Sequence, residues 1–292
     1  MWDPSLQQTP SQQLSRVGIN QQNITTTTAM ADATGSVGKE DYDTHAAIYE
    51  GFARTPGGIL EAQLLASALG DCTGLAVLDL GGGTGLRARQ AVELGASHVD
   101  VVDVSPAMLC IGKQQTSPEH GSRIAWHEAD VSKPLGDRLQ LRETYDLVMA
   151  NWVMDSMGSL ADLEGVWANV GARLRPGGRF VGIRVNDPWA PYLVDGDGRY
   201  GVRLREKERI PGGVRYWYIV DSTDKNEPPI EIEGASMEVS YSGSTELHAK
   251  YGLCDVEIEP FENANVVQED LEFWKPFLER PHMVVVKARK QG

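Results

Sequence analysis

The sequence predicts an α/β protein whose parallel sheet has helices on both faces. Two observations indicate this class. Short apolar segments alternate with segments of helical spacing from about residue 75 to residue 185. The first of these apolar segments runs into a glycine-rich turn at residues 81–85, and the second ends in an acid, Asp103. Right-handed crossovers bring the carboxyl ends of such strands to one edge, where open α/β sheets bind ligands.

The elements follow one another with turn signals between them. Residues 40–54 have apolar positions at helical spacing, and Pro56-Gly57-Gly58 is expected to end that helix. Asn151 follows the fourth strand and is expected at the crevice, together with Asp130 after the third. We expect helices at 59–69, 84–94, 159–174 and near 244–251, and strands at 75–80, 98–103, 123–128, 145–152, 179–185, 254–259 and 283–286.

Residues 186–243 break this alternation. Segments 201–205 and 214–220 alternate like antiparallel strands, and Pro211-Gly212-Gly213 lies between them. We expect an inserted antiparallel sheet at 186–243 that forms a cap over the crevice, within one domain spanning residues 39–292. Residues 1–38 are rich in Gln, Thr and Ser, so a disordered tail is expected there.

The charge balance narrows the choice of partners. The chain has 27 basic and 41 acidic residues, a formal net charge of −14. This composition disfavours nucleic acid and anionic membranes, because phosphate binding needs clustered Lys and Arg. No apolar run is long enough to span a membrane, and no signal peptide is recognisable, so a cytoplasmic protein is expected. The three cysteines and six histidines show no metal-ligand spacing, and no metal is expected.

The glycine turn and Asp103 together predict a nucleoside cofactor. Glycines let backbone N–H groups approach a ligand closely, and an acid at the next strand end can accept hydrogen bonds from two ribose hydroxyls. Two cofactors remain open at this point. Gly83-Thr84-Gly85 followed by Ala88 also fits the dinucleotide pattern, with Asp103 twenty residues after Gly83.

Further residues resemble the class I S-adenosylmethionine-dependent methyltransferases, in particular the small-molecule branch related to ubiquinone and menaquinone methylation. The matching positions are Asp79 with Gly81, Gly83 and Gly85 in the loop, Asp103 after the second strand, Asp130-Val131 after the third, Asn151 after the fourth, and the turn at residues 174–178 (LRPGG). Asp79 has no place in the dinucleotide pattern, and the resemblance therefore favours S-adenosylmethionine over NAD.

The resemblance implies a Rossmann-like, doubly wound sheet of seven strands whose last strand, at 283–288, runs antiparallel. It also implies that the glycines enclose the methionyl part of the cofactor, that Asp130 faces the adenine amine, and that Asn151 lies at the methionine end. Val104 and Met108 are expected to contact the adenine. Tyr42 or Tyr49 is expected near the cofactor, on a lid helix.

The residues that would bind the methyl acceptor are less clearly indicated by the sequence than those expected to bind the cofactor. Many relatives carry histidines where this chain has Asp155-Ser156-Met157, and residues 186–243 contain no transferable motif. Trp152, Trp189 and Tyr216, with Trp217, are candidates for the wall of an acceptor pocket.

Methyl transfer from a sulfonium needs alignment and a dry pocket more than a nucleophilic side chain. A general base is required only for a hydroxyl or a protonated amine, and His45, His127 and Asp155 are the candidates. We therefore predict methyl transfer to oxygen, nitrogen or carbon of a small organic metabolite. Two alternatives remain. The first is a protein of this fold that binds the cofactor but catalyses a non-methylating reaction or acts as a partner. The second is an NAD-dependent oxidoreductase.

Overall fold

The computed structural model describes residues 39–136, 139–194, 196–221 and 229–292, apart from the side chains of residues 46–50. The expected tail at 1–38 lies outside the described residues. Those described all belong to one compact unit, residues 33–292. Among them, no helix combines the length and the apolar character that crossing a membrane requires.

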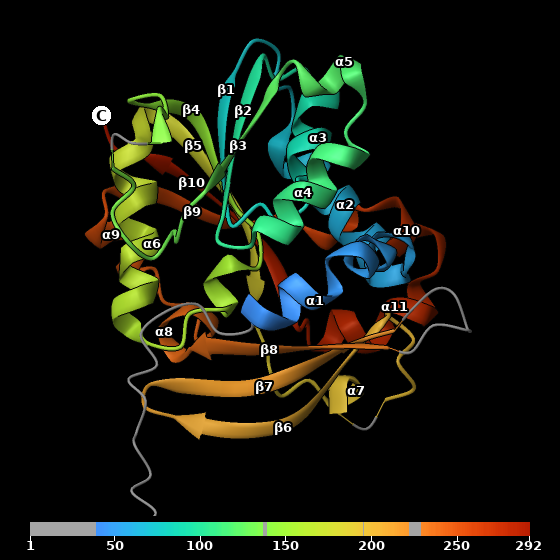
Figure 1. Ribbon diagram of the computed structural model, residues 1–292. Helices are drawn as coiled ribbons and strands as arrows, with labels where there is room; N and C mark the ends of the chain where they lie inside the picture. The colour runs from blue at the N-terminus through green and yellow to red at the C-terminus, as the bar shows by residue number, and fades with distance from the viewer. Residues whose placement is uncertain (1–38, 137–138, 195, 222–228) are drawn as a thin grey trace, which may run out of the picture. The chain divides into compact units, whose positions relative to one another are not determined.

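A seven-stranded sheet forms the centre of this unit (Figure 1). Its strand order is β3-β2-β1-β4-β5-β10-β9, in which β10 pairs antiparallel with both β5 and β9. The prediction of seven strands with an antiparallel last strand is thus confirmed. The strands are β1 (Ala76–Leu80), β2 (His98–Asp103), β3 (Ile124–Glu128), β4 (Tyr145–Ala150), β5 (Leu174–Val185), β9 (Leu253–Ile258) and β10 (Met283–Lys290).

Alternate residues of the central strands pack into two different hydrophobic cores, because successive side chains of a strand point to opposite faces. Val77 of β1 belongs to the core beneath four helices, α2 (Pro56–Leu69), α3 (Leu86–Glu93), α10 (Asn265–Glu269) and α11 (Leu271–Glu279). Its neighbour Leu78 belongs to the core beneath α6 (Leu160–Arg173) and α9 (Glu246–Lys250). The central strands are therefore buried on both faces, as parallel sheets require.

Helices occur at each of the five predicted ranges, but the boundary near Pro56 differs, and α10 and α11 between β9 and β10 were not anticipated. Pro56 begins α2 instead of ending the preceding helix, because the Thr55 hydroxyl accepts a hydrogen bond from Gly58 N at 3.1 Å and caps the helix. The α-helices are α1 (Lys39–Tyr49), α2 (Pro56–Leu69), α3 (Leu86–Glu93), α4 (Pro106–Gln115), α5 (Pro118–Gly121), α6 (Leu160–Arg173), α7 (Pro191–Val194), α8 (Glu238–Tyr241), α9 (Glu246–Lys250), α10 (Asn265–Glu269) and α11 (Leu271–Glu279), with short 3-10 helices at Glu50–Arg54, Val153–Asp155 and Phe261–Asn263.

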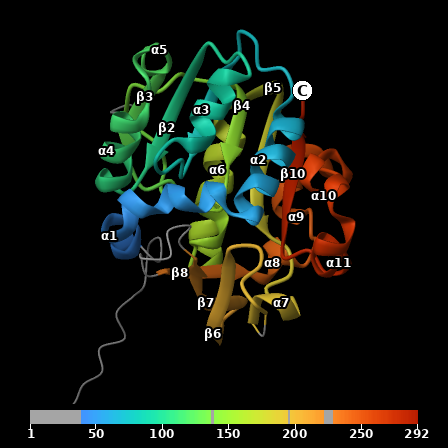
Figure 2. The same ribbon diagram turned by 90° about the vertical axis from the view of Figure 1, so that its right-hand side faces the viewer.

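A second, three-stranded antiparallel sheet is inserted after β5. It consists of β6 (Val202–Ile210), β7 (Gly213–Val220) and β8 (Ile230–Met237), in the order β6-β7-β8. The first two strands match the prediction, whereas β8 was not anticipated. Both views place this sheet beyond the carboxyl ends of β1 and β4, with α1 running between the two sheets (Figures 1 and 2).

Helix α1 is bonded to both sides of this arrangement. The Asp41 carboxylate accepts a hydrogen bond from Glu233 N in β8 at 2.9 Å. The Asp43 carboxylate accepts one from the hydroxyl of Ser105, which caps α4 directly after β2. The helix therefore connects the inserted sheet to the carboxyl edge of the main sheet.

Candidate active site

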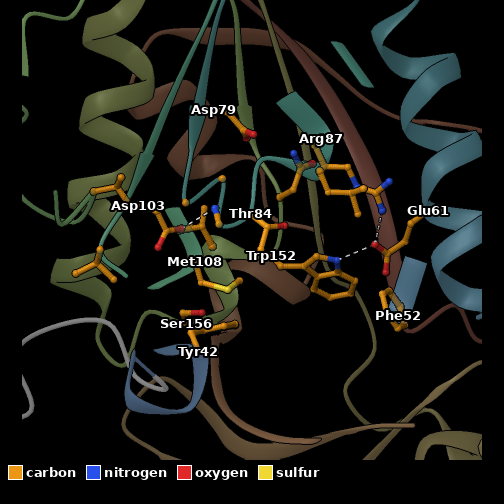
Figure 3. Close-up of a pocket in the computed structure, with 18 of the residues that line it drawn as sticks. Tyr42, Phe52, Glu61, Asp79, Thr84, Arg87, Asp103, Met108, Trp152 and Ser156 are labelled. Atoms are coloured by element: carbon orange, nitrogen blue, oxygen red, sulfur yellow. Dashed lines mark hydrogen bonds and ion pairs between the residues drawn. The ribbon is translucent and has the colours of Figure 1, made fainter. Parts of the chain in front are cut away.

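A cleft opens at the carboxyl edge of β1, β2 and β4 (Figure 3). Its lining comes from the glycine-rich loop, from the turns after β2, β3 and β4, and from α1 to α4. The lining residues are Tyr42, Phe52, Ala53, Glu61, Asp79, Gly81, Gly82, Gly83, Thr84, Leu86, Arg87, Asp103, Val104, Met108, Asp130, Val131, Asn151, Trp152, Val153, Ser156 and Met157.

The loop after β1 is built so that only glycine fits at its most crowded positions. Gly81 has φ of +66°, and a Cβ atom there would lie 2.4 Å from Cγ2 of Val153. A Cβ atom on Gly82 would lie 2.7 Å from Oδ2 of Asp79. Without side chains, the backbone of this loop borders the cleft directly. Gly85, by contrast, caps α3 and does not line the cleft.

Asp103 lies at the end of β2 and is held by the backbone around it. Its Oδ2 accepts a hydrogen bond from Gly83 N at 2.8 Å, and its Oδ1 accepts one from Ser105 N at 2.9 Å. Burial raises the pKa of this carboxyl, and the two backbone donors partly offset that rise. A carboxylate oxygen can accept more than one hydrogen bond, so both oxygens can still accept from a diol.

Asp79 is a buried acid without a hydrogen-bond partner. Its side chain lines the cleft, is only 1% exposed, and neither oxygen meets a donor among the described residues. Burial, and then the nearby Asp103, raise the pKa of Asp79 to about 7. Across the strand ends, Asn151 Nδ2 is also a buried donor without a partner in the described chain. A ligand that carries both an ammonium group and a carboxylate would satisfy these two groups.

The other end of the cleft is apolar with one acid. Val104, Met108 and Val131 line it, as expected for a slot that holds a flat ring. Asp130 Oδ1 accepts from both the backbone N (2.8 Å) and the hydroxyl (2.7 Å) of Ser132, which fixes the carboxylate at the cleft wall. A diol acceptor, an apolar slot, a buried acid and a free amide donor are the groups that S-adenosylmethionine needs. The cleft therefore fits this cofactor.

Glu61 of α2 is a cleft residue that sequence reasoning missed. It is 2% exposed, and its Oε2 accepts hydrogen bonds from the Arg87 guanidinium at 3.1 Å and from Trp152 Nε1 at 3.0 Å. Burial raises the pKa of Glu61, and the adjacent Arg87 opposes that rise. The available signal was an acid within the apolar run of α2, between Leu60 and Leu64.

A second chamber adjoins the cleft on the side of the inserted sheet. The two cavities share five lining residues, Tyr42, Phe52, Glu61, Trp152 and Ser156. The second chamber is completed by Asp155, Val202, Tyr218, Val220, Ile232 and Gly234. Its walls thus come from the inserted sheet, from the segment after β4, and from α1, α2 and the 3-10 helix between them.

Asp155 is held rigidly in this chamber. Its Oδ1 accepts from the Ser236 hydroxyl at 2.6 Å and its Oδ2 from Val185 N at 2.9 Å. The Tyr216 hydroxyl lies 2.5 Å from Ser236 Oγ and extends this chain of hydrogen bonds. Burial raises the pKa of Asp155 to about 6, although both hydrogen bonds oppose the rise.

The remaining candidate residues lie elsewhere. His45 lies on α1 and lines neither cavity. His127 Nε2 lies 2.7 Å from Oδ1 of Asp100, which is buried within the sheet, so this histidine has a structural partner away from the cleft. The side chain of Tyr49 lies outside the described residues. Among the described residues, no group of three His, Cys, Asp or Glu side chains could hold a metal ion.

Of the three residues predicted to wall an acceptor pocket, Trp152, Trp189 and Tyr216, only Trp152 lines either cavity. Trp152 lines both cavities. It lies in the turn directly after β4 and has a left-handed backbone, with φ of +64°. Trp189 is instead 38% exposed beneath the amino group of Lys207. Tyr216 is buried behind the chamber, and its neighbour on the same strand face, Tyr218, lines the chamber with Phe52.

Comparison with known proteins agrees with this geometry. Residues 78–180 match a family model described as a methyltransferase domain. The ubiquinone/menaquinone biosynthesis C-methyltransferase UbiE of Methylobacterium nodulans is 26% identical over 186 residues, covering 62% of this chain and 71% of that protein. The magnesium-protoporphyrin O-methyltransferase of Rhodobacter capsulatus is 35% identical over 75 residues, 26% of this chain and 33% of that protein.

The fold also has solved counterparts. The CcbJ methyltransferase from Streptomyces caelestis superimposes with a TM-score of 0.57 at 19% identity, over 86% of this chain and 98% of that chain.

Proposed function

Because the chain belongs to the class I S-adenosylmethionine-dependent methyltransferases, we propose that it transfers the methyl group of this cofactor to oxygen, nitrogen or carbon of a small organic molecule bound in the second chamber. The observation that carries the proposal is the shared wall of the two cavities. A cofactor in the cleft would direct its reactive end toward an acceptor on the other side of that wall.

The residues of the cleft would position the cofactor. S-adenosylmethionine, when bound, supplies an electrophilic methyl group on a sulfonium. Asp103 would accept hydrogen bonds from the ribose hydroxyls, and Asp130 would face the adenine amine beside Val104, Met108 and Val131. Asp79 and Asn151 would bind the ammonium and carboxylate of the methionyl part, since the Asp79 carboxyl oxygens and the Asn151 Nδ2 have no other partner in the described chain. Gly81 and Gly83 would leave space for that part of the ligand.

The second chamber would align the acceptor and exclude water. Catalysis of an in-line displacement depends on holding two reactants in one geometry in a dry site. The inserted sheet supplies one wall of the chamber, through Val202, Tyr218, Val220 and Ile232. Residues 186–243 would therefore serve as the substrate cap of a methyltransferase domain that spans residues 39–292.

The cellular setting is also part of the proposal. The net charge of −14 supports a small-molecule acceptor in place of nucleic acid, and a cytoplasmic enzyme.

Incubation with S-adenosylmethionine labelled in its methyl group, together with a metabolite extract, tests the proposed function. Label is expected in one or a few small molecules, and Asp103→Ala is expected to reduce the rate at limiting cofactor concentration. S-adenosylhomocysteine binding without any transfer of label to a small molecule would contradict the proposal. Thermal-shift measurements can compare the binding of NAD and S-adenosylhomocysteine. Tighter binding of NAD would contradict the assignment of S-adenosylmethionine as the cofactor.

A further inference from the structure

We infer that the acceptor is a small amine that enters the second chamber as its ammonium ion and is methylated on nitrogen. This inference rests on the proposed function and narrows it to one substrate class. The first support is the charge of the chamber. Its described lining contains two carboxyl groups, those of Glu61 and Asp155, and no Lys, Arg or His side chain.

The two carboxyl groups have different surroundings. Glu61 already has a cationic partner, because the Arg87 guanidinium lies 3.1 Å from its Oε2. Asp155 is 2% exposed and forms no ion pair with a described basic residue. Arg184 is near enough to favour the charged form of Asp155 electrostatically, but its guanidinium donates to the carbonyl oxygens of Val185 and Ser240. A buried carboxylate at a cavity wall is costly without a counter-ion, and an ammonium ligand would supply one.

The neutral walls also suit a cation. Phe52, Trp152 and Tyr218 present aromatic rings to the chamber. The rings of Trp152 and Tyr218 form a corner, with centroids 6.1 Å apart and planes at 76°. An ammonium group within about 6 Å of an aromatic face is attracted by the ring quadrupole, and the attraction grows when the site is desolvated. A carboxylate or phenolate acceptor would instead be repelled by the two acids.

The same groups explain how the amine becomes reactive. An ammonium ion has no lone pair, so one proton must leave before methyl transfer. Asp155 accepts that proton, and its pKa of about 6 lies close to neutral pH. The nitrogen lone pair then forms the N–C bond while the S–C bond breaks, and the sulfur keeps the bonding pair as a neutral thioether. The methylated amine leaves as an ammonium ion, and the proton on Asp155 returns to solvent.

Binding of three matched probes to the protein saturated with S-adenosylhomocysteine tests the charge preference. Benzylamine, benzyl alcohol and benzoate share one ring and differ in charge. Calorimetry at pH 7.5 is expected to show benzylamine binding at least about ten-fold more tightly than the other two. Absence of a preference for the cation overturns the inference, whether the neutral probe binds equally or none of the three binds.

Variants of chamber residues test whether the preference for the cationic probe arises in the second chamber. Asp155→Asn is expected to reduce benzylamine affinity to that of benzyl alcohol, while S-adenosylhomocysteine binding stays within about two-fold of wild type. The matched control is Asp197→Asn, a surface acid whose side chain is 61% exposed and belongs to neither lining. Tyr218→Leu is expected to weaken benzylamine binding several-fold, whereas Tyr218→Phe keeps the aromatic face and the affinity. A preference that survives both Asp155→Asn and Tyr218→Leu contradicts the inference.

Transfer of label separates the inference from the proposed function. Products of the labelled-extract reaction can be divided by cation exchange into basic, neutral and acidic fractions. Label in the basic fraction is expected. Label only in neutral or acidic products would overturn the amine acceptor and leave methyl transfer intact, whereas label in no small molecule would overturn both.

Discussion

The change Asp79→Asn tests the most unusual group of the cleft. In the cofactor-free protein this buried carboxyl has no hydrogen-bond partner in the described chain, and its pKa is raised from 3.8 to about 7. When folding raises the pKa of a carboxyl group, that group contributes its full stability only below the pKa it has in the unfolded chain. This contribution is lost as the pH rises to the pKa that the group has in the folded protein. The wild-type protein should therefore lose stability from this group between about pH 4 and pH 7.

The interval between these pKa values corresponds to about 4 kcal/mol at most, since each tenfold change in proton affinity is 1.36 kcal/mol. An asparagine has the same shape and no charge, so it avoids this cost. Between pH 5 and pH 8, the free energy of unfolding of Asp79→Asn should rise relative to wild type by about 2 to 3 kcal/mol. Urea denaturation of the cofactor-free proteins at both pH values measures this difference, with Asp197→Asn as the exposed control.

The same change should weaken binding of the cofactor. An ammonium–carboxylate hydrogen bond contributes about 1.5 to 3 kcal/mol, so S-adenosylhomocysteine should bind roughly ten- to a hundred-fold more weakly to Asp79→Asn at pH 8. Greater stability with poorer binding would identify Asp79 as a strained ligand-binding group. Parallel stability profiles of wild type and variant from pH 5 to pH 8, or unchanged affinity, would refute this reasoning.

Three further changes test separate parts of the structure. Asp103→Ala should cost about 1.5 to 3 kcal/mol of S-adenosylhomocysteine affinity for each ribose hydrogen bond lost, and calorimetry showing wild-type affinity would reject its assignment. Gly81→Ala should destabilise the protein by about 1 to 3 kcal/mol in urea unfolding, because its Cβ would lie 2.4 Å from Val153 in a left-handed backbone. His127→Gln should lower stability by about 1 kcal/mol, since it weakens the contact with Asp100, yet keep the rate of methyl transfer; a large loss of rate with normal cofactor binding would restore His127 as the base.

The main sheet was predictable because its signals are local. Strand 98–103 matches β2, and the strands beginning at residues 145 and 283 match the starts of β4 and β10. Each is a short apolar run bounded by turn residues. Pro56 was assigned to the wrong side of a helix boundary, because proline fits both just after one helix and at the first position of the next. The hydroxyl of Thr55 decides between them.

The substrate side was less predictable because it depends on contacts between distant segments. Tyr216 and Tyr218 have the same strand spacing, but only Tyr218 borders the chamber, while Tyr216 bonds to Ser236 of β8. The sequence near residue 216 does not indicate which strand pairs with the strand that contains Tyr216. Glu61 was missed for a similar reason, since its partner Trp152 is 91 residues away. Asp155 was named as a candidate base, and the structure adds that it is buried at the wall of the second chamber, with Ser236 and Val185 as partners.

The position of α1 has a thermodynamic consequence for ligand binding. The helix is bonded to β8 through Asp41 and to the start of α4 through Asp43, and its Tyr42 lines both cavities. One structural element thus contributes to two binding equilibria. Ordering this helix by the first ligand reduces the entropic cost for the second, and the coupling is reciprocal by linkage. Occupancy of the cleft should therefore strengthen acceptor binding, and a bound acceptor should strengthen cofactor binding by the same factor.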